Sequence, residues 1–488
     1  MRIPPHTQRS KRSRIPRRSQ GAGHARTSAP PPGETDRVAG ARPARRSTRV
    51  ATVWAAVAAL GLTVAGCGSE DGAQAGSAPP TTVELPRLSG QKLQVAAVWT
   101  GTEQANFTKV LDEFEKRTGA EVSFVPSGDD MSAFVGSKIA GGQPPDVALV
   151  GQVGVLREFA EKGWAKPLGP EAKAQLEKNF SPGWQDLGSH EGTRYGVYFK
   201  VSNKSLIWYN TAAFEYAGAK EPKTWRELLD QAQLISDSGT DPVSVGGADG
   251  WTLTDWFENV YLSQAGPEKY DQLAQHKIKW TDPSVTRALE TLAELWGRKG
   301  MLAGGRSGAL QTAFPDSVTK AFGNAAEPEA GMVFEGDFVA ANVTDAGAEL
   351  GAEAQVFPFP AVGEKAPVVT GGDVAVALRD SKAAQALLTF LASPDAAHIW
   401  AQAGGYVSAN KALDVKAYPN AQFRDIATAL IAAGDDFRFD MSDQAPAAFG
   451  GKPAQGEWKA LQDFLKNPRD VAGIQRQLEA DAAKAYQN

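Results

Sequence analysis

The sequence is poor in cysteine and histidine, the residues that most often build disulfides and metal sites. Cys67 is the only cysteine among 488 residues, and there are five histidines. A single cysteine can form no intramolecular disulfide, so the fold must depend on hydrophobic cores. HExxH, GxSxG and the glycine-rich phosphate motifs are also absent, which argues against a His/Cys metal site and predicts no cofactor. A glycosidase needs only two carboxylates and is not excluded by these absences.

Charge is distributed unevenly along the chain. Residues 1–49 contain 13 Lys and Arg against two acidic residues, Glu34 and Asp36. The remaining residues carry 38 basic and 54 acidic side chains, a formal charge of about −16. The basic leader could be a nucleic-acid arm, but export would remove it, and an acidic protein binds nucleic acid poorly. We therefore expect no nucleic-acid partner.

An export signal follows the basic leader. Val50–Ala65 is uncharged, and small residues precede Cys67, a pattern typical of secretory signals and too short for a comfortable membrane span. Val64–Cys67 resembles a bacterial lipobox, in which the cysteine is lipidated and becomes the mature N-terminus; a chance cysteine is the alternative. We predict that residues 1–66 are leader and signal peptide, with much of the leader preceding the true start codon. Residues 67–89 would be a flexible tether to a lipid anchor on the extracytoplasmic face of the cell membrane.

Strand and helix patterns alternate at the start of the globular region. Strands are expected at 91–100, 121–125 and in GGQPPDVALV, and helices at 103–117, 129–140, 152–162 and 170–178. Such alternation predicts a largely parallel sheet covered by helices on both faces. Ligands of such sheets bind beyond the carboxyl ends of the strands, which selects the loops Trp99–Glu103, Ser127–Asp129 and Val150–Gln152.

A second pattern predicts a passage between two lobes. Arg194–Asn210, RYGVYFKVSNKSLIWYN, indicates two buried strands, Tyr195–Phe199 and Ser205–Tyr209, separated by a polar break at Val201–Lys204. A capping-box pattern at Thr224–Glu227 then predicts the start of a helix.

Three stretches carry a family resemblance: SLIWYNTAAFEYAGAKEPKTWRELLDQAQLI, PPDVALVGQVGVLREFAEKGWAKPL and LLTFLASPDAAHIWAQAGGYVSANKAL. They closely resemble the extracellular solute-binding proteins of bacterial ABC importers, in the carbohydrate-binding branch. The resemblance covers roughly Leu93–Asn488 and implies an α/β, two-lobed periplasmic-binding-protein-like fold (type II) that closes on its ligand by hinge motion. Without it, the first stretch is simply two core strands and an amphipathic helix.

The resemblance also implies the division into lobes. Crossings are expected near Val201–Lys204, Val356–Pro358 and Gly405–Ala409. Lobe 1 would comprise residues 90–203 and 358–408, and lobe 2 would comprise residues 204–357 and 409–488.

Several candidate ligand-binding residues come from the resemblance. Trp99, Glu103, Ser127 and Gln152 match positions at or near the cleft, although each could be an ordinary loop residue or helix cap. The segment GWTLTDWFENVY is similar to one that supplies cleft contacts in the family. An aromatic face packs on the C–H face of a pyranose, and carboxylates bind its hydroxyls, so its best candidates are Trp251 and Asp255. The alternative is a helix with Trp256 and Phe257 in the core, which we expect for Phe257.

Other candidates are less well matched. Gly336-Asp337-Phe338 replaces the family's commoner Gly-x-Trp, so stacking by Phe338 is open, and Glu335 or Asp337 could make polar contacts instead. A Gly371-Gly372 turn before a strand could expose backbone amides. The loop at 436–446 is either an internal ion-pair cluster or part of the cleft. The remaining candidates are Asn203, Tyr209 and Arg438.

The resulting prediction is a monomeric, lipid-anchored protein that is not an enzyme. It would capture a di- or oligosaccharide, α-glucoside-like, and deliver it to an ABC permease in the membrane. The alternatives are a secreted glycosidase with paired carboxylates in the cleft, and a purely structural surface lipoprotein.

Overall fold

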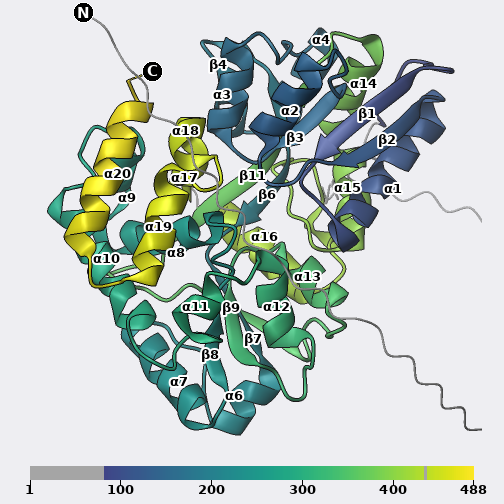
Figure 1. The fold of residues 1–488 in the computed structure, drawn as a ribbon. Helices are drawn as coiled ribbons and strands as arrows, with labels where there is room; N and C mark the ends of the chain where they lie inside the picture. The colour runs from purple at the N-terminus through teal and green to yellow at the C-terminus, as the bar shows by residue number, and fades with distance from the viewer. Residues whose placement is uncertain (1–81, 433–436, 488) are drawn as a thin grey trace, which may run out of the picture. The chain divides into compact units, whose positions relative to one another are not determined.

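The computed structural model describes residues 82–432 and 437–487 (Figure 1), so the predicted lipidation site Cys67 lies outside the described residues. Two sheets organise these residues. The first has six strands in the order β12-β11-β3-β1-β2, with β6 also paired to β11. Its strands are β1 (Lys92–Ala97), β2 (Glu121–Pro126), β3 (Val147–Val150), β6 (Gly196–Asn203), β11 (Val369–Ala377) and β12 (Arg438–Phe439).

The first sheet mixes parallel and antiparallel pairs. Strand β1 pairs in parallel with β2 and β3, as the alternating pattern predicts, whereas β11 runs antiparallel to β3 and β6. We call this sheet and its helices lobe 1. The helices are α1 (Gly101–Thr118), α2 (Met131–Ala140), α3 (Val153–Glu161), α4 (Pro170–Asn179), α5 (Pro182–Leu187), α14 (Lys382–Leu391), α15 (Pro394–Ala403) and α16 (Ala421–Ala432). A short hairpin, β4 (Ser189–His190) and β5 (Thr193–Arg194), and a 3-10 turn, η1 (Val415–Ala417), complete it.

The second sheet has four strands in the order β10-β7-β9-β8 and forms lobe 2. They are β7 (Leu206–Asn210), β8 (Asp241–Ser244), β9 (Ala330–Phe334) and β10 (Ala354–Pro358). Its helices are α6 (Thr211–Ala217), α7 (Trp225–Asp237), α8 (Trp251–Ala265), α9 (Pro267–Ala274), α10 (Pro283–Trp296), α11 (Gly305–Ala309), α12 (Phe314–Phe322), α13 (Val339–Asp345), α17 (Met441–Gln444), α18 (Ala447–Gly450), α19 (Gly456–Lys466) and α20 (Val471–Ala485). In Figure 1 the C-terminal helices α19 and α20 lie beside α8 and α10.

Local signals in the sequence explain several element boundaries. The capping box at the start of α7 is confirmed: the Thr224 side chain accepts from the backbone of Glu227, and the Glu227 side chain reaches back to Thr224. Of the two dense aromatic cores, one covers lobe 1 and extends into lobe 2 at Trp208 and Val333, and the other contains Trp256 and Phe257 of lobe 2. Among the described residues, no helix is long and apolar enough to span a membrane.

Within residues 82–432 and 437–487 the chain passes between the sheets three times. It leaves β6 at Asn203 and enters β7 at Leu206, so the break is shorter than the expected Val201–Lys204. It returns between the end of β10 and the start of β11.

The expected third crossing near Gly405–Ala409 is wrong. Val407 still accepts a hydrogen bond from Val201 of β6, the Tyr418 hydroxyl accepts one from the backbone of Ser408, α16 packs against β6, and η1 packs against α15. The chain leaves lobe 1 only after β12, whose two residues pair with the start of β11, and continues into α17. The segment that follows residue 409 therefore belongs first to lobe 1, because its apolar side chains are buried there.

A second correction concerns Gly371 and Gly372, which lie inside β11 and do not form a turn. A Cβ at Gly372 would stand 2.8 Å from the Lys200 carbonyl oxygen and 3.0 Å from the Tyr198 ring. Glycine is needed there because strand β6 approaches closely, so the pattern reports packing between strands.

Candidate ligand-binding cleft

A cavity of about 410 Å³ lies between the lobes, and residues of both lobes line it. The size falls within the range of small-molecule sites. Lobe 1 contributes a polar wall, which we define as Thr100, Glu103, Asp129, Gln152, Lys200 and Asp373, with Trp99 beside it. Lobe 2 contributes an aromatic wall, which we define as Trp251, Phe314, Phe338 and Trp458.

Three rings of the aromatic wall, those of Trp251, Phe314 and Phe338, pack on one another. Trp251 is the first residue of α8, and its ring centroid lies 5.2 Å from that of Phe314 and 6.0 Å from that of Phe338. Phe314 and Phe338 are in turn 5.5 Å apart and nearly perpendicular. Rings in mutual edge and tilted contact hold one another in place, so the wall offers a fixed apolar surface to a ligand.

Part of the polar wall lies just after the parallel strands, as predicted, whereas Lys200 and Asp373 lie on β6 and β11. Trp99 and Glu103 follow β1, and Gln152 follows β3, at the carboxyl ends of two parallel strands. Gln152 precedes α3 but makes no side-chain capping bond to it. Its amide therefore has donors and acceptors available for a ligand in the cavity.

Lys200 joins the two walls from the floor of the cleft. It lies on β6, its side chain is 3% exposed, and its ammonium pairs with Glu103. The same ammonium is 5.5 Å from the ring centres of both Trp99 and Phe338. Burial alone would lower the pKa of Lys200, but the nearby carboxylates of Glu103 and Asp373 outweigh it and raise the pKa. The lysine is therefore a fixed cation under the ligand space.

Lys204 holds a second set of carboxylates at the first crossing. Its Nζ lies 3.3 Å from Asp255 Oδ1, 2.5 Å from Asp440 Oδ2 and 3.4 Å from Asp443 Oδ2. Burial would lower the pKa of Lys204, but these acids raise it well above its usual value. The ammonium also lies 5.8 Å from the Trp251 ring centre. The crossing strand, helix α8 and the segment entering α17 are thus tied together directly behind the aromatic wall.

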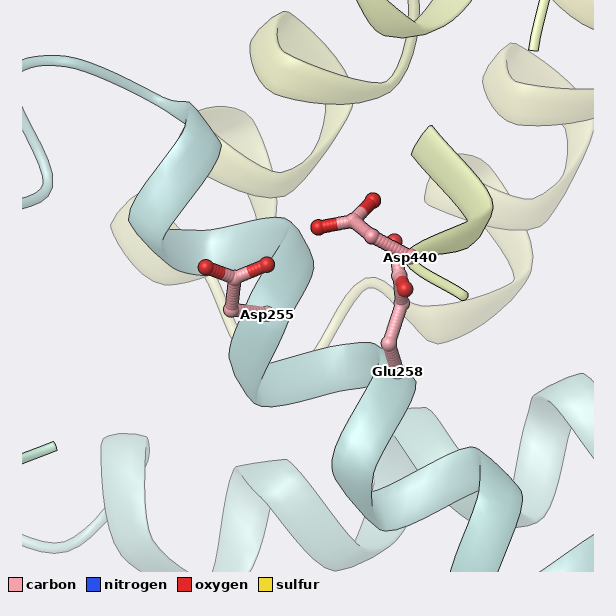
Figure 2. A group of neighbouring side chains, drawn as sticks. All are labelled: Asp255, Glu258 and Asp440. Atoms are coloured by element: carbon pink, nitrogen blue, oxygen red, sulfur yellow. The ribbon is translucent and has the colours of Figure 1, made fainter. Parts of the chain in front are cut away.

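Asp255, Glu258 and Asp440 bring carboxylate oxygens within 4.8 Å of one another, and Figure 2 shows the three side chains gathered beside α8. Their partners indicate an internal ion-pair cluster. Glu258 accepts from the backbone N–H groups of Met441 and Ser442 and from Tyr270. Asp440 binds Lys204 and caps α17. Since the Lys204 ammonium already provides the positive charge, nothing in these contacts calls for a metal ion.

Too many acids surround Lys204 for all of them to be ionised. Burial raises the pKa of Glu335 and Asp255, with neighbouring carboxylates adding to the effect. Beside the other lysine, burial raises the pKa of Asp337 to about 7 and that of Asp373 to about 6. Protonated carboxyls in this region can donate hydrogen bonds as well as accept them.

Six of the thirteen candidate residues line the cavity: Trp99, Glu103, Gln152, Trp251, Phe338 and Gly372. Three others lie close behind it. Asp255 and Glu335 are almost fully buried beneath the aromatic wall, and a Cβ on Gly371 would meet the Lys204 side chain at 2.7 Å. Ser127 precedes the lining residue Gly128 and donates to its carbonyl oxygen at 2.9 Å.

Three candidates are not placed in the cleft. Asn203 contacts the hinge: its backbone N–H donates to Asp337, and it borders a separate cavity of about 620 Å³. The Tyr209 hydroxyl donates to Glu221 at 2.9 Å, and its ring packs on Phe214. Arg438 pairs with Asp271 at 2.8 Å. Both interpretations of the 436–446 loop hold, because Asp440 and Asp443 pair with Lys204 in an ion-pair cluster and Asp443 also lines the cavity.

Sequence reasoning missed several residues of the cleft, among them Lys200, Lys204, Phe314, Asp373 and Trp458. Lys200 carries a recognisable signal, since it interrupts a run of strand-forming apolar residues and a buried lysine must find carboxylate partners, whereas Lys204 lies in the polar break and carries no such signal. Phe314 and Trp458 are far from the predicted loops in sequence, and only the tertiary fold brings them together.

Most of the chain is similar to known proteins. A profile of the family described as "Bacterial extracellular solute-binding protein" matches residues 99–398. The osmoprotective compounds-binding protein GgtB of Synechocystis sp. is 31% identical over 403 residues, covering 79% of this chain and 92% of that protein. The alpha-glucosides-binding periplasmic protein AglE of Rhizobium meliloti is 32% identical over 407 residues, covering 80% and 87%.

Solved structures share the fold. The bacterial solute receptor AcbH, described with a preference for β-D-galactopyranose, superposes with a TM-score of 0.68 at 20% identity, covering 82% of this chain and 100% of that one. The binding protein RafE in complex with raffinose gives a TM-score of 0.66 at 17% identity, covering 81% and 99%. The two-lobed α/β fold expected from the sequence is thereby confirmed.

Proposed function

Because the chain belongs to the bacterial extracellular solute-binding proteins, we propose that it is the sugar receptor of an ABC importer, working as a monomer outside the cytoplasm. It captures a di- or oligosaccharide, α-glucoside-like, between its two lobes and delivers it to a membrane permease. The observation that carries this proposal is the pairing of an aromatic wall from lobe 2 with a polar wall from lobe 1 across one cavity.

The two walls match the two kinds of surface on a sugar. A pyranose has an apolar C–H face that packs on a ring such as Trp251, and a belt of hydroxyls that hydrogen-bond to carboxylates and amides such as Glu103 and Gln152. The cavity carries more acids than lysines, so a neutral sugar suits it better than a phosphorylated or uronic sugar. The name of AglE, an alpha-glucosides-binding protein, supports the class of glucoside.

Hinge motion would close the lobes. The crossings place Lys204 and Asp440 where two connecting segments meet, so movement there changes the width of the cleft. A ligand that touches both walls binds the closed form more tightly and shifts the equilibrium toward it. The closed form would be the one that the permease recognises.

Export and anchoring form a separate part of the proposal. The uncharged run before Cys67 supports secretion, and lipidation of this cysteine would hold the receptor at the membrane. Metabolic labelling with a radioactive fatty acid should mark the wild-type protein and not Cys67→Ser. Persistent labelling of the variant would contradict the anchor.

A thermal-shift screen of the purified protein against mono-, di- and oligosaccharides tests the sugar-binding proposal. We expect a large stabilisation by one neutral glucoside, which mass spectrometry recovers intact. Cleavage of that sugar would favour the glycosidase alternative, and no stabilisation by any sugar would contradict the proposed ligand class.

A further inference from the structure

One carboxylate of lobe 2 lies on the N-terminus of a lobe 1 helix. Asp345, the last residue of α13, accepts hydrogen bonds from the backbone N–H of Thr102, at 3.2 Å, and from the Thr102 hydroxyl. Thr102 is in the first turn of α1, an 18-residue helix whose own N-cap residue, Thr100, makes no side-chain capping bond. The cap of α1 is therefore supplied from the other lobe.

The sequence around this contact suits it. Gly101 has φ +56°, and a Cβ at this position would stand 2.5 Å from Asp345 Oδ2, so glycine allows the carboxylate to approach. A second close approach lies nearby, where a Cβ on Gly405 of lobe 1 would stand 3.4 Å from Ala341 Cβ in α13. Helices α1 and α13 thus pack against each other across the lobes.

The position of Asp345 is unfavourable for its own helix. A negative charge at a helix C-terminus opposes the helix dipole, whereas a negative charge at an N-terminus is stabilised by it and by the free N–H groups. Asp345 is placed badly for α13 and well for α1. The favourable interaction exists only while the lobes are together.

We propose that Asp345 is a closure residue, whose carboxylate caps α1 across the cleft and stabilises the closed form. Asp345 is a positioning residue: it acts on ligand release through Thr102 and α1. Since Thr102 does not line the cavity whereas Asp345 does, the two can be separated experimentally. The inference rests on the proposed function for the identity of the ligand, but the contact itself can be tested without any ligand.

The binding test compares Asp345→Ala, Thr102→Val and the double variant, using the glucoside that stabilises the wild-type protein most. We expect Asp345→Ala to weaken binding about two- to fivefold, the range given by an anion at an exposed helix terminus, through faster release with an unchanged association rate. The double variant should be no weaker than Asp345→Ala. Additive losses would mean that Asp345 contacts the sugar directly and would overturn the proposal. Glu329→Gln, an exposed acid of lobe 2 paired with Lys320, is the matched control and should bind like the wild type.

The second test measures the distance between the lobes. Spin labels at Lys116→Cys and Arg226→Cys, both highly exposed, report on lobes 1 and 2 in a Cys67→Ser full-length background. Asp345→Ala should shift the distances toward the open form, with or without sugar. If no sugar binds but this shift occurs, the ligand proposal fails and the closure residue stands. Distances that stay unchanged in both conditions would overturn the closure residue, whatever the sugar result.

Discussion

The two walls of the cleft differ in how they are built and in how well they can be predicted from the sequence. The polar wall combines side chains that follow the parallel strands of lobe 1, such as Glu103 and Gln152, with Lys200 and Asp373 on β6 and β11. The aromatic wall gathers Trp251, Phe314 and Phe338 from separate parts of lobe 2, above a buried charge cluster. The polar wall is therefore a property of topology, and the aromatic wall is a property of packing.

The charge cluster behind the aromatic wall should give the largest effect. Lys204→Met leaves Asp255 and Asp440 buried without their cation, so we expect the free energy of unfolding to fall by about 3–5 kcal/mol. Chemical denaturation measures this directly. Lys116→Met, whose side chain is 77% exposed, is the control and should change stability by less than about 1 kcal/mol. A Lys204→Met loss as small as that of the control would show that the cluster does not support the wall.

The acids beneath each wall should differ in their response to pH. Burial raises the pKa of Asp337 to about 7 from an unfolded value of about 3.9, so the folded state binds more protons between these values. Stability from this group is therefore present below about pH 4 and lost as pH rises to 7, by roughly 4 kcal/mol at most. Asp337→Asn should remove that loss. The difference in free energy of unfolding between this variant and the wild type should therefore increase, in favour of the variant, as pH rises from 4 to 8.

Asp373, on the polar side, provides the comparison. Its pKa is raised only to about 6 and it borders the open cavity, so Asp373→Asn should show a smaller gain over a narrower pH range. Denaturation series at several pH values test both variants. If both asparagine variants gained the same free energy of unfolding over the same pH range, the expected difference between the two walls would be contradicted.

Removing a ring from the aromatic wall should weaken sugar binding more than any single polar change. Trp251→Ala takes away an apolar platform and its contacts with Phe314, and we expect a loss of about 1–3 kcal/mol in binding free energy by calorimetry. Tyr216→Ala, a 77% exposed ring of the same lobe, should leave the affinity unchanged. Equal affinities for the two variants would contradict the stacking role.

The polar wall should give the smallest effect. Gln152→Ala removes one hydrogen-bonding amide, which is worth about 0.5–1.5 kcal/mol. Ser127→Ala is the matched control, because Ser127 does not line the cavity and its hydroxyl is engaged with Gly128. A loss for Ser127→Ala equal to that for Gln152→Ala would mean that the cavity lining is assigned wrongly.

The predictions from sequence succeeded where the contacts join residues close in sequence and failed where the contacts join residues far apart in sequence. Strand ends, the capping box at Thr224 and the strand pair around Lys204 depend on neighbours in sequence, and these were predictable. The third crossing was misplaced because η1, α16 and β12 pack against α15, β6 and β11 of lobe 1, which no local pattern reports. Tyr209 matched the expected type of residue, but its strand turns the ring toward Phe214 and away from the cleft.

A crystal structure of the protein with its most stabilising sugar tests the central claim most directly. The account predicts a pyranose with its C–H face on Trp251 and its hydroxyls within hydrogen-bond distance of Glu103 or Gln152, between closed lobes. A sugar bound elsewhere, for example in the cavity beside Asn203 at the hinge, would contradict the account.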